Sequence, residues 1–278
     1  LDGTVFGASP LSDRFGAPGG ALGFDGVDDY VKTQAHNAVD QAEEGSLSLW
    51  FKSSNVPGTS GFPEGKLFTY STDQSNQSIF GVAIQDDGRI KATPKYDSPS
   101  TPTQFSEIEV LDGKWHHLVV VADGSSLRKV YIDGREVGTT FDPKGTSADG
   151  SEWFADISGV DSYDHFFSFG RQLRGGIAQS EFQGAIDEIR IYDYPLTPQE
   201  VQDLCDVDGI CDGGTIPGSV EFCSLPDLHF DGNNISEPFV VAASRGVGGP
   251  VNERLEAYPL MGTSVSRGIH VFQLALMR

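Results

Sequence analysis

Asp-Gly pairs between short apolar segments are the feature of this sequence that most constrains its fold. They stand at residues 87–88, 123–124 and 133–134. Glycine tolerates a positive φ angle, so such a pair between two apolar runs favours a tight β-hairpin turn. Apolar residues also recur with a period of two, as in residues 47–51. Many short strands with almost no helical periodicity predict an all-β fold, a two-sheet antiparallel sandwich.

One short helix is predicted near the end of the β-rich region. Thr197 suits the cap position, Pro198 suits the first helical turn, and Glu200 stands three residues after the cap. Val201 and Leu204 would form its buried stripe. The helix is expected to end near Leu204.

The charge balance excludes several classes of function. The chain has 278 residues, with 19 Lys and Arg against 40 Asp and Glu, a formal net charge of −21. A nucleic-acid-binding protein needs a basic face for phosphates, so no nucleic-acid partner is expected. Docking on anionic lipid is disfavoured for the same reason. No apolar run approaches the ~20 residues of a membrane span, so membrane insertion is not expected.

Three cysteines are present. Cys205 and Cys211 flank a five-residue loop that contains glycine, which a disulfide could close. The alternative is that both stay reduced and structural. Cys223 has no assigned partner, and we find no second pair or histidines at zinc-ligand spacing.

Composition divides the chain into three parts. Residues 1–211 hold the strand pattern, and residues 212–218 are rich in glycine and read as a linker. Residues 219–278 are expected to form a small extension of β character, with the apolar run at 269–277 as one strand. This extension is a candidate surface for contacts between copies of the chain.

The order of motifs resembles a known family. Residues 13–31 resemble the opening of a laminin G-like, concanavalin A-like jelly-roll domain of bacterial surface and secreted proteins. Later signatures follow in the family's order across roughly residues 3–204, whereas residues 212–278 are not covered. These signatures are residues 47–52, 113–120, 130–138, 169–171 and 182–201. The resemblance implies two antiparallel sheets and a secreted or cell-surface location.

The resemblance also implies a structural calcium ion. Asp25, Asp28 and Asp29 put three carboxylates around a glycine turn, and Ca²⁺ prefers such oxygen ligands. Asp187 lies in the late strand where related jelly rolls supply an ion ligand. Because the first and last strands of such folds can lie side by side, one ion could join them. The alternative is that these aspartates only bond their own turn.

Sugar binding by this fold class would use exposed aromatic rings and a few polar groups. Trp153, Tyr163 and His165 lie in loop segments, and Arg171 and Arg174 follow. We predict these five residues as the ligand site, with Trp153 as the leading exposed ring. Packing of the loop against a sheet edge is the alternative.

Two further tryptophans and the overall charge refine this prediction. Trp50 and Trp115 belong to the family motifs and are expected to be buried. The net negative charge disfavours sulfated or uronic-acid glycans unless calcium or the pair Arg171 and Arg174 bridges them.

A catalytic site is weakly indicated. Glu107 and Glu109 share a strand face but lack the third acid of a glycosidase pattern. His116 and His117 are neighbours in a strand, so their side chains point to opposite faces and suit one metal ion poorly. No catalytic residue is assigned.

The sequence therefore predicts a non-catalytic extracellular binding module, a lectin-like domain for carbohydrate that is stabilised by calcium. Its partner would be a glycan or another extracellular protein. A structural or adhesive surface protein, self-assembling through residues 219–278, is the alternative. A polysaccharide-degrading enzyme is the minor alternative.

Overall fold

The computed structural model describes most of the chain up to residue 206 and one short segment near its end. The described residues are 3–34, 42–55, 63–74, 79–95, 102–144, 146, 148–158, 163–175, 177–206 and 269–272.

Sheet A is antiparallel and has eight strands. Its order is β1 (Gly3–Phe6), β4 (Tyr30–Gln34), β14 (Phe166–Phe169), β6 (Glu64–Ser71), β7 (Ile79–Gln85), β8 (Arg89–Lys95), β9 (Thr103–Glu109) and β13 (Thr139–Asp142).

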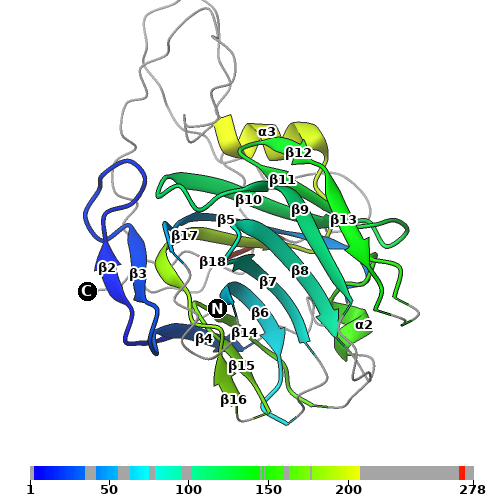
Figure 1. Cartoon of the computed structure of the whole chain (residues 1–278), viewed down its shortest axis with the longest axis horizontal. Helices are drawn as coiled ribbons and strands as arrows, with labels where there is room; N and C mark the ends of the chain where they lie inside the picture. Colours follow the sequence, from blue (N-terminus) through cyan, green and yellow to red (C-terminus); the bar gives the residue numbers. More distant parts are fainter. Residues whose placement is uncertain are drawn as a thin grey trace, which may run out of the picture.

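Sheet B is also antiparallel and stacks against sheet A (Figure 1). Its order is β12 (Arg135–Val137), β11 (Lys129–Ile132), β10 (Trp115–Ala122), β5 (Gly45–Lys52), β17 (Gln183–Tyr192), β3 (Ala21–Asp25) and β2 (Ser9–Leu11), and β18 (Ile269–Phe272) also pairs with β17. The described remainder is a hairpin of β15 (Gln172–Arg174) and β16 (Ile177–Gln179) and two helices, α2 (Phe154–Ser158) and α3 (Pro198–Asp206). This confirms the predicted two-sheet antiparallel sandwich.

The core lies between the two sheets. The inward residues of β5, at positions 47, 49 and 51, are fully buried there, as their period of two predicts. From sheet A, Phe68 contributes a ring that packs 5.4 Å from Phe167 and 6.4 Å from Phe80. Such offset and edge contacts add to the apolar burial that drives folding.

The predicted glycine turns join neighbouring strands. Asp133 and Gly134 connect β11 to β12 with φ angles of 51° and 76°. Two positive φ angles in a two-residue loop match the turn type that suits the twist of a hairpin. Gly88, with φ of 84°, closes the hairpin between β7 and β8.

Helix α3 begins as predicted. The Thr197 hydroxyl accepts a hydrogen bond from the backbone N–H of Glu200, and the Glu200 carboxylate accepts one from the backbone N–H of Thr197. The helix continues to Asp206, two residues beyond the predicted end. Val201 packs with Val119 and Val121 on the face of sheet B that points away from sheet A. We call this face the outer face of sheet B.

The predicted disulfide, linker and extension fall largely outside the described residues. Cys205 is buried at the end of α3, but Cys211 and residues 212–268 are not described, so the disulfide, the linker and assembly through 219–278 stay predictions. Residues 269–272 do form a strand, as expected, and it pairs with residues 189–192 of β17. Among the described helices, none has the length and apolar character to cross a membrane.

Candidate functional site

A row of four residues crosses the outer face of sheet B beyond the part covered by α3. Trp115 of β10 pairs with Lys52 of β5, and Lys52 pairs on its other side with Ala185 of β17. Ala185 in turn pairs with Gly23 of β3. Directly paired residues in adjacent strands point to the same face. The row therefore presents an indole, an ammonium group, a methyl group and a bare backbone in sequence.

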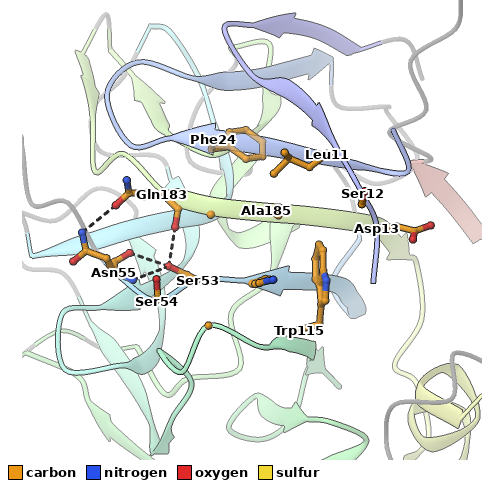
Figure 2. A pocket seen from close by; sticks show the side chains of 13 residues that line it. Leu11, Ser12, Asp13, Phe24, Ser53, Ser54, Asn55, Trp115, Gln183 and Ala185 are labelled. Atoms are coloured by element: carbon orange, nitrogen blue, oxygen red, sulfur yellow. Dashed lines mark hydrogen bonds between the residues drawn. The ribbon is translucent and has the colours of Figure 1, made fainter. Parts of the chain in front are cut away.

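The small residues in this row leave a trough. Leu11 of β2 leans over Gly23, where a Cβ atom would lie 2.5 Å from the Leu11 side chain. Figure 2 shows Leu11 and Trp115 on opposite sides of the strand that carries Ala185. The cavity between them measures about 670 Å³. Such a volume falls in the usual range for small-molecule sites, about 300–1,000 Å³.

Glycine is required at one point of the trough floor. Gly184 has a φ angle of 150°, and a Cβ atom there would lie 2.1 Å from the backbone oxygen of Lys52. A larger residue would therefore push β17 away from β5. The close approach of these two strands depends on this glycine.

Polar groups gather at one end of the trough. The Asn55 amide donates a hydrogen bond to the Gln183 side-chain oxygen at 3.0 Å. The Ser53 hydroxyl lies 2.7 Å from the backbone oxygen of Gln183 and 2.8 Å from that of Asn55. These bonds hold two exposed amides in place, and exposed amides can bond sugar hydroxyls in both directions.

A buried cluster supports the trough from the adjoining part of the outer face. The Arg14 guanidinium lies 4.7 Å from the Trp50 ring centroid, and its Nη1 lies 2.8 Å from Asp187 Oδ2. Burial raises the pKa of Asp187 to about 6, although Arg14 acts in the opposite direction. Trp50 is fully buried, as expected. Trp115 is only half-buried, so the prediction that it is buried is wrong.

The expectation of an exposed ring at Trp153 is also wrong. Trp153 is fully buried and stacks on Phe154 at 4.4 Å, just where α2 begins. The loop folds into the edge of the sandwich instead of projecting from it. His165 is likewise buried, and it stacks on Tyr70 at 4.7 Å. Neither ring is available to stack on a sugar.

Tyr163 is exposed and borders a second, smaller hollow. Its exposed fraction is 45%, and the hollow measures about 430 Å³. Lys32 Nζ lies 3.8 Å from the Phe166 ring centroid and 2.7 Å from Asp73 Oδ2. The cation in this hollow is therefore already partnered. Among the four predicted ligand residues whose side chains are described, Tyr163 alone lines one of these two cavities.

Arg171 lines neither cavity. Arg171 Nη2 lies 3.1 Å from Glu181 Oε1, and both side chains are largely buried. Its charge is thus neutralised within the protein. Arg174 ends β15, and its side chain lies outside the description.

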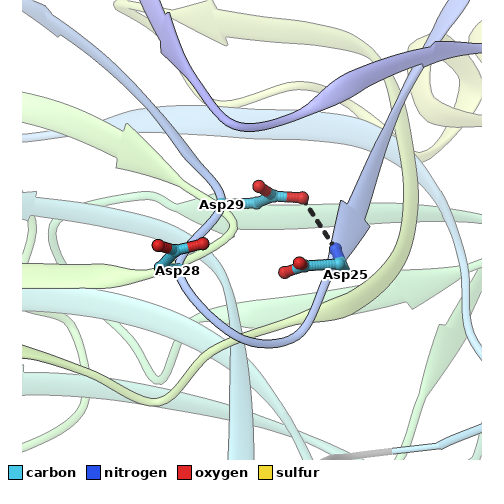
Figure 3. A group of neighbouring side chains, drawn as sticks. All are labelled: Asp25, Asp28 and Asp29. Atoms are coloured by element: carbon cyan, nitrogen blue, oxygen red, sulfur yellow. Dashed lines mark hydrogen bonds between the residues drawn. The ribbon is translucent and has the colours of Figure 1, made fainter.

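Three carboxylates meet in the turn between β3 and β4 (Figure 3). One oxygen from each of Asp25, Asp28 and Asp29 lies within 4.8 Å of the others. Asp29 is buried and accepts a hydrogen bond from the backbone N–H of Asp25 at 2.8 Å. Burial, and then the neighbouring carboxylates, raise the pKa of Asp29. The donor chemistry fits a hard cation such as Ca²⁺.

Asp187 does not join this group. Strands β3 and β17 lie side by side, as expected, but Asp25 pairs with Gln183. Asp187 lies four residues farther along β17, about 13 Å away at the usual rise of a strand. One ion with bonds near 2.4 Å cannot reach both carboxylates. The prediction that Asp187 shares an ion with Asp25 is therefore wrong.

No sequence motif marks the trough. Lys52, Ala185 and Asn55 carry no motif of their own, and they meet only through the pairing of β5 with β10 and β17. One signal was present. Trp115 has the same parity along β10 as the outward Val119, and opposite parity to the inward Leu118.

Comparison with known proteins agrees with this fold. Three solved structures are similar to the chain at low sequence identity, and the two with a TM-score above 0.5 show a shared fold alone. The binding domain of Paraclostridial Mosquitocidal Protein 1 gives a TM-score of 0.53 at 12% identity, over 74% of this chain and 47% of that one. The botulinum neurotoxin serotype C1 binding domain gives 0.52 at 14%, over 74% and 47%. The Ruminococcus gnavus IT-sialidase CBM40 bound to alpha2,3 sialyllactose gives 0.49 at 17%, over 73% and 98%.

The sequence itself matches a family model over residues 25–202, more than half of the chain. This match covers strands from both sheets and reaches into α3. The protein belongs to the Laminin_G_3 family of the concanavalin A-like lectin/glucanases superfamily.

Proposed function

We propose that this protein is a non-catalytic, extracellular carbohydrate-binding module and that the trough on sheet B is its glycan site. The observation that carries this proposal is the half-exposed indole of Trp115 beside a floor of Ala185 and Gly184. A flat apolar ring beside an open floor suits the apolar face of a sugar ring. The amides of Asn55 and Gln183 would bond the sugar hydroxyls at the rim.

The composition of the trough favours binding over hydrolysis. Among the thirteen described residues that line it, Asp13 carries the single carboxylate. A glycosidase needs two carboxyl groups, about 5–5.5 Å apart when retaining and about 6.5–9.5 Å apart when inverting. Asp13 Oδ1 also accepts hydrogen bonds from the backbone N–H groups of Phe15 and Ala17, which commits it to the loop.

A calcium ion at Asp25, Asp28 and Asp29 is the second part of the proposal. An ion there would offset most of the charge of three carboxylates in the turn that leads from sheet B to sheet A. It would stabilise the fold and would not take part in binding at the trough. None of the three residues lines the trough.

Glycan-array binding with three variants tests the site. We expect Trp115→Ala to lose at least about tenfold in affinity for any glycan the wild-type protein binds, a loss of about 1.4 kcal/mol. Tyr163→Ala is the matched control, because it removes an exposed ring from the other hollow. Ala185→Leu, which fills the trough floor, should weaken binding as Trp115→Ala does. If Trp115→Ala keeps full glycan binding and Tyr163→Ala loses it, the glycan site is the smaller hollow and not the trough.

A further inference from the structure

Lys52 stands in the middle of the trough and forms no ion pair with any residue that the structure describes. It is exposed, it lies between Trp115 and Ala185 on the same face, and neither neighbour has an oxygen in its side chain. Every other lysine whose side chain is described lies within 4.0 Å of a carboxylate oxygen. Those lysines are Lys32, Lys66, Lys91, Lys114, Lys129 and Lys144.

This arrangement is unusual for a chain with a net charge of −21, in which carboxylates outnumber basic groups by about two to one. Most lysines in such a chain find an acidic neighbour, as six of those described here do. Lys52 instead lines a cavity, and its two cross-strand neighbours supply one aromatic ring and one methyl group. A carboxylate or sulfate group of a bound ligand could therefore form an ion pair with the ammonium of Lys52.

The one described carboxylate that lines the trough, that of Asp13, does not form an ion pair with Lys52. Asp13 also lines the cavity, but its Oδ1 caps the turn at Phe15 and Ala17 at 2.9 and 2.8 Å. No ion pair joins Asp13 to Lys52 among the described contacts. The trough thus holds one engaged carboxylate and one cation that is open to a ligand.

We infer that the trough selects a sugar that carries an anionic group, with Lys52 binding that group while the sugar ring stacks on Trp115. The inference rests on the proposed function and names its ligand class. Lys52 takes the role that the sequence suggested for Arg171, which Glu181 already neutralises.

The net negative charge of the protein does not prevent this selection. Charges farther than a Debye length, about 10 Å at 0.1 M salt, are largely screened. A contact between Lys52 and a bound anionic group spans only a few ångströms, well inside this length, and is therefore screened less. Repulsion should therefore slow the encounter at low salt, while the contact with Lys52 sets the preference between bound ligands.

The inference is tested with two pairs of probes, each an acidic sugar and its neutral counterpart. The first pair is trigalacturonic acid and its methyl ester, and the second is 3′-sulfated lactose and lactose. Isothermal titration of the full chain with both pairs separates a carboxylate source from a sulfate source. We expect at least one acidic probe to bind about tenfold more tightly than its neutral partner.

Three variants test whether the preference for an acidic probe comes from the Lys52 side chain. Lys52→Gln should bring the ratio of the two affinities close to one, whereas Lys52→Arg should keep most of it. Lys114→Gln is the matched control, because it removes the same charge from a residue adjacent to Trp115 that pairs with Asp112 and does not line the trough. It should leave the ratio unchanged.

The outcomes separate this inference from the proposed function. Binding of neutral and acidic probes with equal affinity, or an unchanged ratio in Lys52→Gln, would overturn the inference while the glycan site stands. Binding of neither member of either pair by the wild-type chain, with no glycan bound on an array, would overturn the proposed function and the inference with it.

Discussion

The indole of Trp50 stacks on the imidazole of His117, with ring centroids 5.0 Å apart and planes inclined by 23°. Both rings lie buried on the outer face of sheet B, and Ser48 Oγ lies 2.9 Å from His117 Nε2. Burial, and then the positive charge of Arg190, lowers the pKa of His117 to about 3. His117 is therefore a neutral structural residue at physiological pH.

The pKa of the neighbouring His116 is shifted in the opposite direction. Burial lowers the pKa of His116, but hydrogen bonds to Asp133 and Asp112 outweigh it and raise the pKa above 6.5. We expect NMR titration to show His116 protonating above that value and His117 staying neutral to about pH 3. Signals assigned with His116→Asn and His117→Asn variants would check this. A His117 signal that titrates near pH 6 would show that the ring is not buried as described.

His117 also links stability to pH. Its folded pKa lies below its unfolded value of 6.5, so the unfolded chain binds the proton first. The stabilising contribution is therefore fully present above pH 6.5 and is lost as the pH falls toward 3. Urea denaturation across this range should show the free energy of unfolding decreasing as the solution is acidified.

A second pH-dependent group lies on sheet A. Glu64 Oε2 lies 2.7 Å from Lys91 Nζ, and Glu64 Oε1 lies 3.0 Å from Lys66 Nζ. Burial would raise the pKa of Glu64, but the two lysines hold it well below its ordinary value of 4.5. A depressed pKa gives stability that is present above pH 4.5 and is lost as the pH falls below it.

We therefore expect Glu64→Gln to lower the free energy of unfolding at pH 7 by about 3–5 kcal/mol, because it removes a buried carboxylate that pairs with both Lys66 and Lys91. The variant should also lose part of the decline in stability below pH 4.5. Asp142→Asn, which breaks an exposed pair with Lys144, is the control and should cost less than about 1 kcal/mol. Equal effects of the two substitutions in chemical denaturation would contradict this account.

The fold could be predicted because its signals are local. Alternation along residues 47–51 identifies which side chains enter the core, and the pair Asp133 and Gly134 specifies a hairpin without reference to distant residues. The capping box at Thr197 is local in the same sense. Each of these predictions is confirmed.

The site could not be predicted because its signals are not local. Lys52, Trp115 and Ala185 become neighbours only through the register of three strands, and the register on β17 shifts at a bulge between Asp187 and Arg190. The burial of the loop that carries Trp153 could not be predicted from the sequence either. Trp153 precedes a helix of only five residues, too short to reveal its buried side by periodicity.

Calcium should raise the melting temperature if Asp25, Asp28 and Asp29 bind it. At 100-fold excess over the dissociation constant, a ligand that binds only the folded state adds about 2.7 kcal/mol. For a domain of this size that corresponds to about 5–10 °C. Asp29→Asn should abolish the response, whereas Asp87→Asn, in another turn, should keep it. The same melting temperature in EDTA and in calcium would rule out an ion that stabilises the fold.

An aromatic residue of this domain can either pack in the core or contact a ligand, and Trp153 packs in the core. Trp153 lies 5.0 Å from Phe80 and fills space against Gly45, where a Cβ atom would lie 2.5 Å from Nε1. Trp153→Ala should therefore cost about 3–5 kcal/mol in the free energy of unfolding, and the smaller change Trp153→Phe should cost less. Tyr163→Ala, an exposed position, should change it by less than about 0.5 kcal/mol.

Glycan affinity of the folded protein should be the same in Trp153→Phe and in the wild type, because the buried ring does not reach the trough. Differential scanning calorimetry with binding measured well below the melting temperature makes this test. A Trp153→Phe protein that melts like the wild type but no longer binds glycan would mean that this ring faces the ligand after all. The inward fold of the loop before α2 would then be incorrect, because a ring stacked on Phe154 and packed against Phe80 cannot also contact a sugar.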